Sequence, residues 1–90
     1  MKTNTGTPIE ALDLPPEFDT LAPDRRVAAL LRAARQATGA SILKFSHRVG
    51  YHENTIQRWE RGGVYTIAGF VAWCDALHVR PSDVLRRCGL

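Results

Sequence analysis

The sequence has no long hydrophobic run and only two cysteines among its 90 residues. No stretch approaches the ~20 apolar residues that a membrane-spanning helix needs. Residues 1–6 contain no apolar segment of the kind found in a secretory signal. Cys74 and Cys88 form neither a CxxC pair nor a dense disulfide framework. These absences predict a cytoplasmic protein in a reducing compartment, with no membrane partner.

Motifs that carry enzyme chemistry are also missing. The sequence contains no Gly-rich phosphate loop, no paired-carboxylate site and no catalytic triad. Cys74 and His78 are four residues apart, with Cys88 further on, and such an arrangement can serve a zinc ion or a nucleophilic cysteine. Cys74 falls on the expected buried face of its helix, however, where a free cysteine behaves as a small hydrophobic residue. We therefore expect no enzyme activity, no metal or cofactor, and no small-molecule ligand.

Proline is scarce after residue 23, and the charge changes sign at the same place. Residues 1–23 contain all the prolines except Pro81, and they carry one lysine against four acidic residues, a formal net charge of −3. Residues 24–90 carry eleven lysines and arginines against five acidic residues, a formal net charge of +6. A small basic domain is typical of a protein with a polyanionic partner.

The segment before residue 24 is expected to lack long helices. Because Pro15-Pro16 prevents a continuous helix, the sequence predicts an extended acidic arm over residues 1–23, with a short turn at Ile9–Leu12. Two alternatives remain for this arm. Either it is disordered, or it docks on the rest of the chain through its apolar side chains, which are Leu12, Leu14, Phe18 and Leu21.

From Asp24 onward the spacing of apolar residues is helical, and no alternating strand pattern competes with it. Asp24 is the expected cap of a first helix that ends at Thr38-Gly39. A fourth helix is expected after a cap at Thr66, and a fifth from Pro81 to about Arg87. The buried faces are expected to be Val27, Leu30, Leu31 and Ala34 in the first helix, and Ile67, Phe70, Val71, Cys74 and Leu77 in the fourth.

Between them the sequence predicts two short helices joined by a tight turn. Ser41 is the expected cap of a helix that runs to Arg48, with Phe45 and Val49 facing inward, and Gly50 supplies the turn. The next helix is expected from about His52 to Arg61, ended by Gly62-Gly63. The fold class that follows is all-α: a compact five-helix domain over residues 24–90.

The expected helix from His52 to Arg61 has two different faces. Ile56 and Trp59 are three residues apart and face inward. The outer face consists almost wholly of hydrogen-bonding side chains, which is what reading a DNA major groove requires. A solvated amphipathic helix has the same periodicity, so the order of the residues must decide between the two.

That order resembles the lambda-repressor-like helix-turn-helix family, the Cro/XRE type of transcriptional regulator. The resemblance extends from about Val27 to Leu85. It is clearest at Gly50, at Thr55-Ile56 and in the run Arg58-Trp59-Glu60-Arg61-Gly62, followed by Ala76-Leu77 and Val79–Leu85. The resemblance implies a DNA-binding regulator that is similar to a bacterial or phage repressor and associated with the nucleoid.

The resemblance also implies roles for the matching positions. The positions that contact base edges are His52, Glu53, Asn54 and Arg58, with Gln57 as a secondary candidate. The positions that contact the DNA backbone are Ser41, Thr55 and Arg61. Glu60 matches a structural acid whose partner is Arg35, and Trp59 is expected in the core. Glu53 is alternatively a first-turn acid favoured by the helix dipole, and His52 is alternatively no more than a helix cap.

Two positions depart from the family pattern. Ile42 occupies a place that commonly holds a phosphate-contacting glutamine, and it can instead meet a thymine methyl group. The segment Gly63-Val64-Tyr65 lacks the basic residues that usually grip phosphate there. Both departures predict weaker DNA binding without a change of fold.

The C-terminal end and the acidic arm are candidate sites for binding a protein partner. Family members often dimerise through the end that Val84–Leu90 matches, so we expect a homodimer on DNA, although Val84 and Leu85 alternatively just close the core. The competing function is a protein-interaction module, or an antitoxin-type regulator, in which the helical domain or the acidic arm binds another protein.

Overall fold

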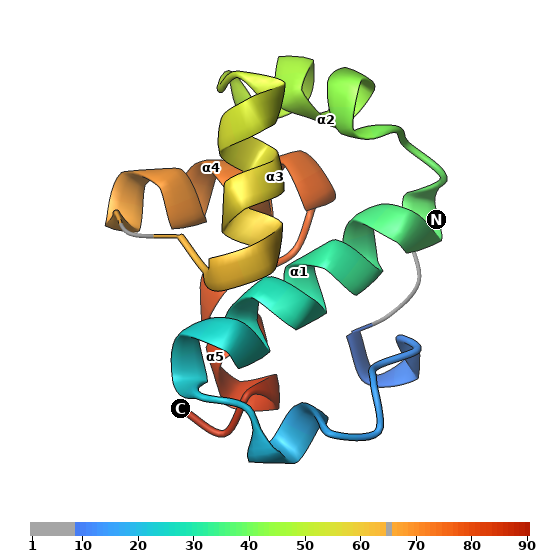
Figure 1. The fold of residues 1–90 in the computed structure, drawn as a ribbon, viewed down its shortest axis with the longest axis vertical. Coiled ribbons are helices and arrows are strands. Elements are labelled where there is room, and N and C mark those ends of the chain that lie inside the picture. Colours follow the sequence, from blue (N-terminus) through green and yellow to red (C-terminus); the bar gives the residue numbers. More distant parts are fainter. Residues whose placement is uncertain (1–8, 65) are drawn as a thin grey trace.

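The computed structural model describes residues 9–64 and 66–90 of the chain. Within these residues the fold is all-α, with five α-helices and no strands, as the sequence predicts. The helices are α1 (Pro23–Thr38), α2 (Ile42–Val49), α3 (Glu53–Gly62), α4 (Ile67–Leu77) and α5 (Pro81–Arg87). Two 3-10 turns, η1 (Ile9–Ala11) and η2 (Phe18–Thr20), precede them. Figure 1 shows α3 running downward at the front of the molecule, from beside α2 at the top to α1 below.

Helix α1 begins earlier than expected. Its N-cap is Ala22 and Pro23 occupies the first helical position, where the missing N–H of proline costs nothing. Asp24 is therefore inside the first turn, and its carboxylate accepts a hydrogen bond from the Arg25 N–H (3.0 Å) instead of capping the helix. The other end agrees with the prediction, because Gly39 adopts a left-handed conformation at φ 79°.

The buried stripe of α1 is confirmed and forms the centre of the core. Leu30 and Leu31 are fully buried, and Val27 and Ala34 are each 7% exposed. Helix α1 packs against α3, α4 and α5. Other fully buried side chains that complete this core are Phe45, Ile56, Trp73, Cys74 and Val84.

Helix α4 buries a different face from the one that its apolar spacing indicates. Thr66 caps it as expected, accepting a hydrogen bond from the Gly69 N–H. Cys74 and Leu77 are buried, but Ile67 is 82% exposed and Val71 is 38% exposed. The remaining buried positions are Gly69, Trp73 and Ala76. The helix has one charged residue, so it lacks a polar face that would mark the side turned to solvent.

Of the two alternatives for the arm, residues 9–22 show the docked one. Phe18 is 4% exposed and Ile9 is 8% exposed, and both belong to the core. Leu12 and Leu14 pack partly buried against it. The Arg87 guanidinium lies 5.3 Å from the centre of the Phe18 ring, so η2 is linked to α5 by a cation–π contact. The prolines exclude a long helix, as predicted, but not burial of the side chains beside them. Residues 1–8 of the expected arm lie outside the described part of the chain.

None of the helices in residues 9–64 and 66–90 combines the length and the apolar character that crossing a membrane requires.

Candidate nucleic-acid interface

The turn between α2 and α3 depends on a glycine with a left-handed backbone and on a small buried residue one turn earlier in α2. Gly50 adopts φ 86°, a left-handed conformation, and its N–H donates to the Ser46 carbonyl oxygen (2.8 Å). Ser46 is 3% exposed, and its hydroxyl donates back to the Leu43 carbonyl oxygen (2.6 Å). Ile56 is fully buried, as expected for the residue that fills the space between the two helices. The described structure therefore has the two short helices joined by a tight glycine turn that the sequence predicts.

The inner face of α3 is fixed by aromatic packing. Trp59 is 6% exposed, and its ring centre lies 5.5 Å from that of Trp73 and 4.8 Å from that of Tyr51. The Trp59 ring also lies directly over Gly69, where an added Cβ would come within 2.9 Å of it. This packing agrees with the prediction that Trp59 belongs to the core.

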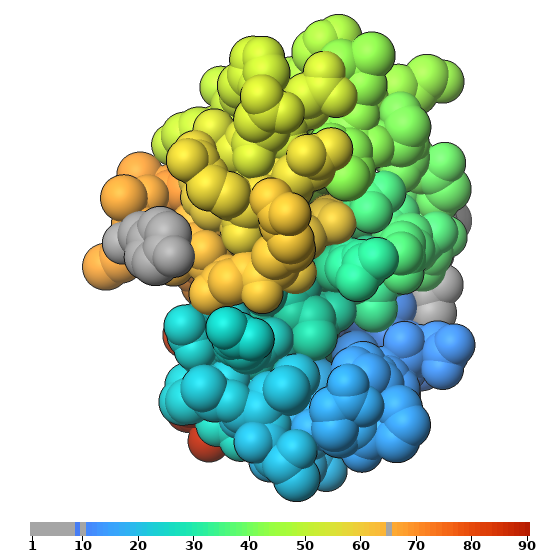
Figure 2. Space-filling view, in the orientation of Figure 1, coloured from blue at the N-terminus to red at the C-terminus, as the bar shows by residue number. Residues whose placement is uncertain are grey.

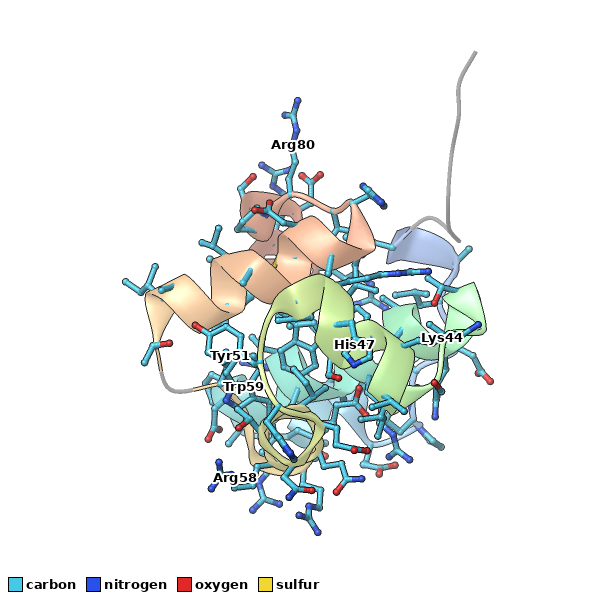
Figure 3. All side chains as sticks on the ribbon, turned by 90° about the horizontal axis from the view of Figure 1, so that it is seen from above. Lys44, His47, Tyr51, Arg58, Trp59 and Arg80 are labelled. Atoms are coloured by element: carbon cyan, nitrogen blue, oxygen red, sulfur yellow. The ribbon has the colours of Figure 1, made fainter. Side chains whose placement is uncertain are left out.

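The outer face of α3 is polar and open to solvent. The exposed side chains are His52, Asn54, Gln57, Arg58 and Arg61, while Glu53 and Thr55 are half-buried. Figure 2 shows the side chains of α3 covering the upper middle of one face, beside those of α2 and above those of α1. Arg58 projects outward from α3 on the side of the molecule opposite to Arg80 (Figure 3). All five positions that the resemblance assigns to base contact lie on α3 or at its N-cap.

Of the three positions assigned to backbone contact, Ser41 and Thr55 have hydrogen-bond partners within the protein. Ser41 caps α2, with its hydroxyl oxygen accepting from the Lys44 N–H (3.2 Å). The Thr55 hydroxyl accepts a long hydrogen bond from Arg58 Nη2 (3.5 Å). Ser41 and Arg61 are exposed. These contacts leave the hydroxyl protons of Ser41 and Thr55 and the whole Arg61 guanidinium able to donate to phosphate.

The expected pair between Arg35 and Glu60 is present and buried. Arg35 Nε donates to Glu60 Oε2 (2.6 Å) and Arg35 Nη2 donates to Glu60 Oε1 (3.1 Å). Arg35 Nη1 donates to the Ala40 carbonyl oxygen (2.9 Å), which ties the pair to the segment before α2. The pair joins α1 to α3 in a bidentate geometry of high directionality. Glu60 is thus part of the scaffold, as the sequence predicts.

Ile42 and the loop after α3, the two places where the sequence departs from the pattern it resembles, both pack against other parts of the protein. Ile42 is half-buried and packs against the core beside Gln57, at the wall of a hollow that Arg32 and Arg61 also line. Gly63 folds back onto the start of α1, where an added Cβ would lie 3.0 Å from the Asp24 carbonyl oxygen. Its φ of 104° also suits glycine alone. The loop after α3 therefore turns toward α1 rather than away from the body of the molecule.

Arg32 is a basic residue near α3 for which the sequence predicts no role. Its side chain is 58% exposed, and Arg32 Nε lies 3.9 Å from Glu60 Oε1. The spacing of three between Arg32 and Arg35 was a signal that the two share one side of α1. Since Arg35 already neutralises Glu60, Arg32 adds a positive charge beside the C-terminal half of α3.

The cysteines have the properties of core residues. Burial, with a smaller effect of the Asp75 charge, raises the pKa of the Cys74 thiol from 9.0 to about 12. Burial also raises the pKa of Cys88, against the opposing effect of Arg26 and Arg87. A thiol with a raised pKa is a poor nucleophile and a poor metal ligand. His78 ends α4 in a left-handed conformation at φ 59°. Among the described residues no three His, Cys, Asp or Glu side chains are grouped as a metal ion would need.

The C-terminal end both closes the core and leaves apolar surface. Val84 is fully buried and Cys88 is 1% exposed, whereas Leu85 is 37% exposed and Leu90 is 55% exposed. Leu85 lines a shallow groove of about 300 Å³ between the starts of α1 and α4 and helix α5. We call this the α4–α5 groove. Its other lining residues are Asp24, Val27, Val64, Thr66, Ile67 and Phe70.

Comparison of the chain with protein-family models, with curated proteins and with solved structures gives no match in any of the three.

Proposed function

We propose that this protein binds double-stranded DNA in a sequence-specific manner, with α3 inserted in the major groove. The observation that carries the proposal is the contrast between the two faces of α3. Its inner face is held by Ile56, Trp59 and the Glu60 ion pair. Its outer face presents only hydrogen-bonding side chains to solvent, at the end of a tight glycine turn. A rigid helix with a free polar face can enter a groove without rearrangement of the fold.

In this mechanism each of three side chains of α3 contacts a different base. Arg58 donates to guanine O6 and N7, Asn54 pairs with adenine N6 and N7, and Glu53 accepts from a cytosine amine. The backbone contacts of Ser41, Thr55 and Arg61 set the register and depend on salt. By occupying a promoter in this way, the protein acts as a Cro-like regulator that represses transcription.

The amount and the position of the basic charge support a polyanionic partner such as DNA at α3. Residues 24–90 carry a formal net charge of +6. Arg58, Arg61 and Arg32 gather on or beside α3, and all three are exposed. Ile42 and the uncharged loop after Gly62 reduce the number of phosphate contacts, so we expect moderate affinity per protein chain.

Selection of duplexes from a random pool tests the proposal. A selected duplex is expected to bind at least ~10³-fold more tightly than bulk DNA, with affinity that falls steeply as salt rises. Arg58→Ala and Asn54→Ala are each expected to relax the choice at one base pair, at a cost of ~1–3 kcal/mol. Arg80→Ala is the matched control for Arg58→Ala, since it removes the same charge from the opposite side (Figure 3). If the pool yields no sequence preferred over bulk DNA, the proposed function is wrong.

We further propose that two copies bind together through the α4–α5 groove. Ile67 stands 82% exposed at the rim of this groove, so one chain carries both an apolar projection and an apolar hollow. A two-fold pairing places each projection in the hollow of the other copy. Two domains also supply the phosphate contacts that one small domain lacks, on half-sites spaced by about one helical turn of DNA.

The alternative function is binding of another protein by the acidic arm. It is tested by neutralising acidic side chains of the arm, because deleting the arm is not a clean test. Ile9 and Phe18 belong to the core, so removal of residues 1–22 would damage the fold. Asp13, Glu17 and Asp19 are exposed, and their exchange for Asn, Gln and Asn keeps the docking contacts. A partner captured by the wild type and lost by this variant would favour the alternative.

A further inference from the structure

The N-cap of α3 is a histidine, and its ring has a defined hydrogen-bond partner. His52 precedes the first residue of α3 with an extended backbone (φ −63°, ψ 146°). Its Nδ1 atom accepts a hydrogen bond from the Asn54 backbone N–H at 3.0 Å. Ser, Thr, Asp and Asn usually perform this role, each with a side-chain oxygen. Here an aromatic nitrogen satisfies one of the free N–H groups at the start of the helix.

This contact determines where the ring proton is. A neutral imidazole has one donor nitrogen and one acceptor nitrogen. Because Nδ1 accepts from Asn54, its lone pair is engaged and the proton must be on Nε2. The cap thus holds His52 in the tautomer that has an N–H donor at the far edge of its ring. The His52 side chain is exposed, so this donor is available to a ligand.

We infer that His52 is a specificity-determining residue that donates Nε2–H to a guanine edge in the DNA site. The inference rests on the proposed function and assigns a direction to one contact within it. Guanine presents two adjacent acceptors, N7 and O6, in the major groove, whereas cytosine presents an amine donor. Adenine places an amine donor beside its N7. Thymine presents one acceptor, O4, beside its methyl group. A single N–H donor is therefore matched best by guanine, which offers two adjacent acceptors.

The cap restricts His52 to donating from Nε2, whereas a histidine without this cap could donate or accept there. A histidine free to change tautomer can donate to guanine or accept from an adenine or cytosine amine. The Asn54 contact removes the second option, since accepting at Nε2 would require the proton on Nδ1 and the loss of the cap. His52 therefore unites two tasks, starting the recognition helix and rejecting bases with an amine at that position.

The tautomer is tested on the protein without DNA. Long-range ¹H–¹⁵N correlation spectra of the histidine ring are expected to show an unprotonated Nδ1 and a protonated Nε2 at His52. Assignment comes from comparison with His52→Ser. His47 and His78, which make no ring contact of this kind among the described residues, provide internal references. A protonated Nδ1 in the neutral ring at His52 overturns the inference.

The base contact is tested with two variants that separate capping from donation. His52→Ser keeps an N-cap oxygen but has no donor at the reach of Nε2, whereas His52→Ala loses both. On the duplex selected by the wild type, His52→Ser is expected to fold as stably as the wild type and to lose discrimination at one base pair. A 7-deazaguanine at that pair removes N7 and is expected to weaken the wild type about tenfold, and His52→Ser little.

The remaining outcomes are each decisive. Equal weakening of His52→Ser on all duplexes means that Nε2 donates to a phosphate, and it overturns the base contact. Unchanged affinity and preference means that His52 only caps the helix, and it also overturns the inference. Failure of the proposed function looks different from both, since the wild type itself would then prefer no sequence.

Discussion

At the scale of single residues, the buried ion pair of Arg35 and Glu60 sets how α3 is held. Arg35→Met is expected to lower the free energy of unfolding by about 3–5 kcal/mol, because Glu60 would remain buried with Arg32 as a distant partner. The double variant Arg35→Met, Glu60→Leu is expected to lose much less than the sum of the single variants, since no charge is then stranded. Urea denaturation of the four proteins measures both effects.

Arg32→Met provides the control for this cycle. It also removes an arginine near Glu60, but that side chain is 58% exposed and a pair of this kind contributes at most about 1 kcal/mol. A loss from Arg35→Met no larger than that from Arg32→Met would contradict the structural role of the buried pair.

The buried Cys74 thiol makes the free energy of unfolding depend on pH. The native thiol keeps its proton up to a pKa of about 12, while the unfolded thiol loses its proton near 9.0. Between these values the native state binds more protons than the unfolded state, so the free energy of unfolding falls as pH rises. This group adds at most about 1.4 kcal/mol per pH unit to that fall.

Denaturation between pH 8 and pH 10.5 measures this slope. Cys74→Ala is the comparison, because it leaves every other titrating group in place and is expected to show a shallower decline. Equal slopes for the two proteins would mean that the Cys74 thiol is not shielded from water as its burial indicates.

At the scale of elements, α4 lies close to α3 because Gly69 leaves room for Trp59. A Cβ at Gly69 would be 2.9 Å from the Trp59 ring and from the Thr66 hydroxyl oxygen. Gly69→Ala is therefore expected to destabilise the fold by about 1–3 kcal/mol, although alanine is the better helix former by roughly 1 kcal/mol. Thermal or urea unfolding measures the change.

Ala68→Gly is the matched substitution beside it. Ala68 is exposed on the same turn of α4, so its exchange reports helix propensity alone, at a loss of roughly 1 kcal/mol. Stabilisation by Gly69→Ala would show that Trp59 moves aside at little cost and that the close contact of α3 with α4 is not fixed by this glycine.

The elements also show what the sequence can and cannot predict. The helix ends at Gly39, Gly50 and Thr66 follow from local chemistry, because a left-handed glycine or a capping hydroxyl acts within a few residues. The start of α1 was misplaced by two residues, because Asp24 is a good N-cap residue and Pro23 is a good first helical residue, and the chain uses the second option with Ala22 as its N-cap.

Predictions that depended on packing partners were less accurate. The face of α4 was misassigned because apolar residues surround the helix, and the choice between Val71 and Trp73 depends on the position of Trp59, distant in the sequence. Burial of Ile9 and Phe18 depends likewise on α5. At the site, the order of residues in α3 identified the exposed face and the Arg35–Glu60 pair. For His52 the sequence left a base contact and a helix cap as alternatives, and the structure shows the cap and the ring atom that makes it, Nδ1, which accepts from the Asn54 N–H.

At the scale of the whole molecule, the exposed apolar side of α4 bears on assembly. Ile67→Glu is expected to leave the fold intact, because the side chain is 82% exposed and a surface change alters stability by about 0.5 kcal/mol or less. It is expected to abolish dimer formation, since it places a charge in the apolar α4–α5 groove of the other copy. The Ile67→Glu variant is expected to bind a duplex with one half-site as tightly as the wild type does. It is expected to lose the tighter binding that the wild type shows for a duplex with two half-sites.

Sedimentation equilibrium and binding to duplexes with one or two half-sites together test this expectation. Leu43→Glu is the control for assembly, because Leu43 is an exposed apolar residue (51%) on α2, outside the groove. If Ile67→Glu and the wild type have the same mass in solution and the same affinity for both duplexes, the groove is not the contact between copies. A loss of assembly in Leu43→Glu alone would instead assign the contact to α2, the helix beside the recognition surface.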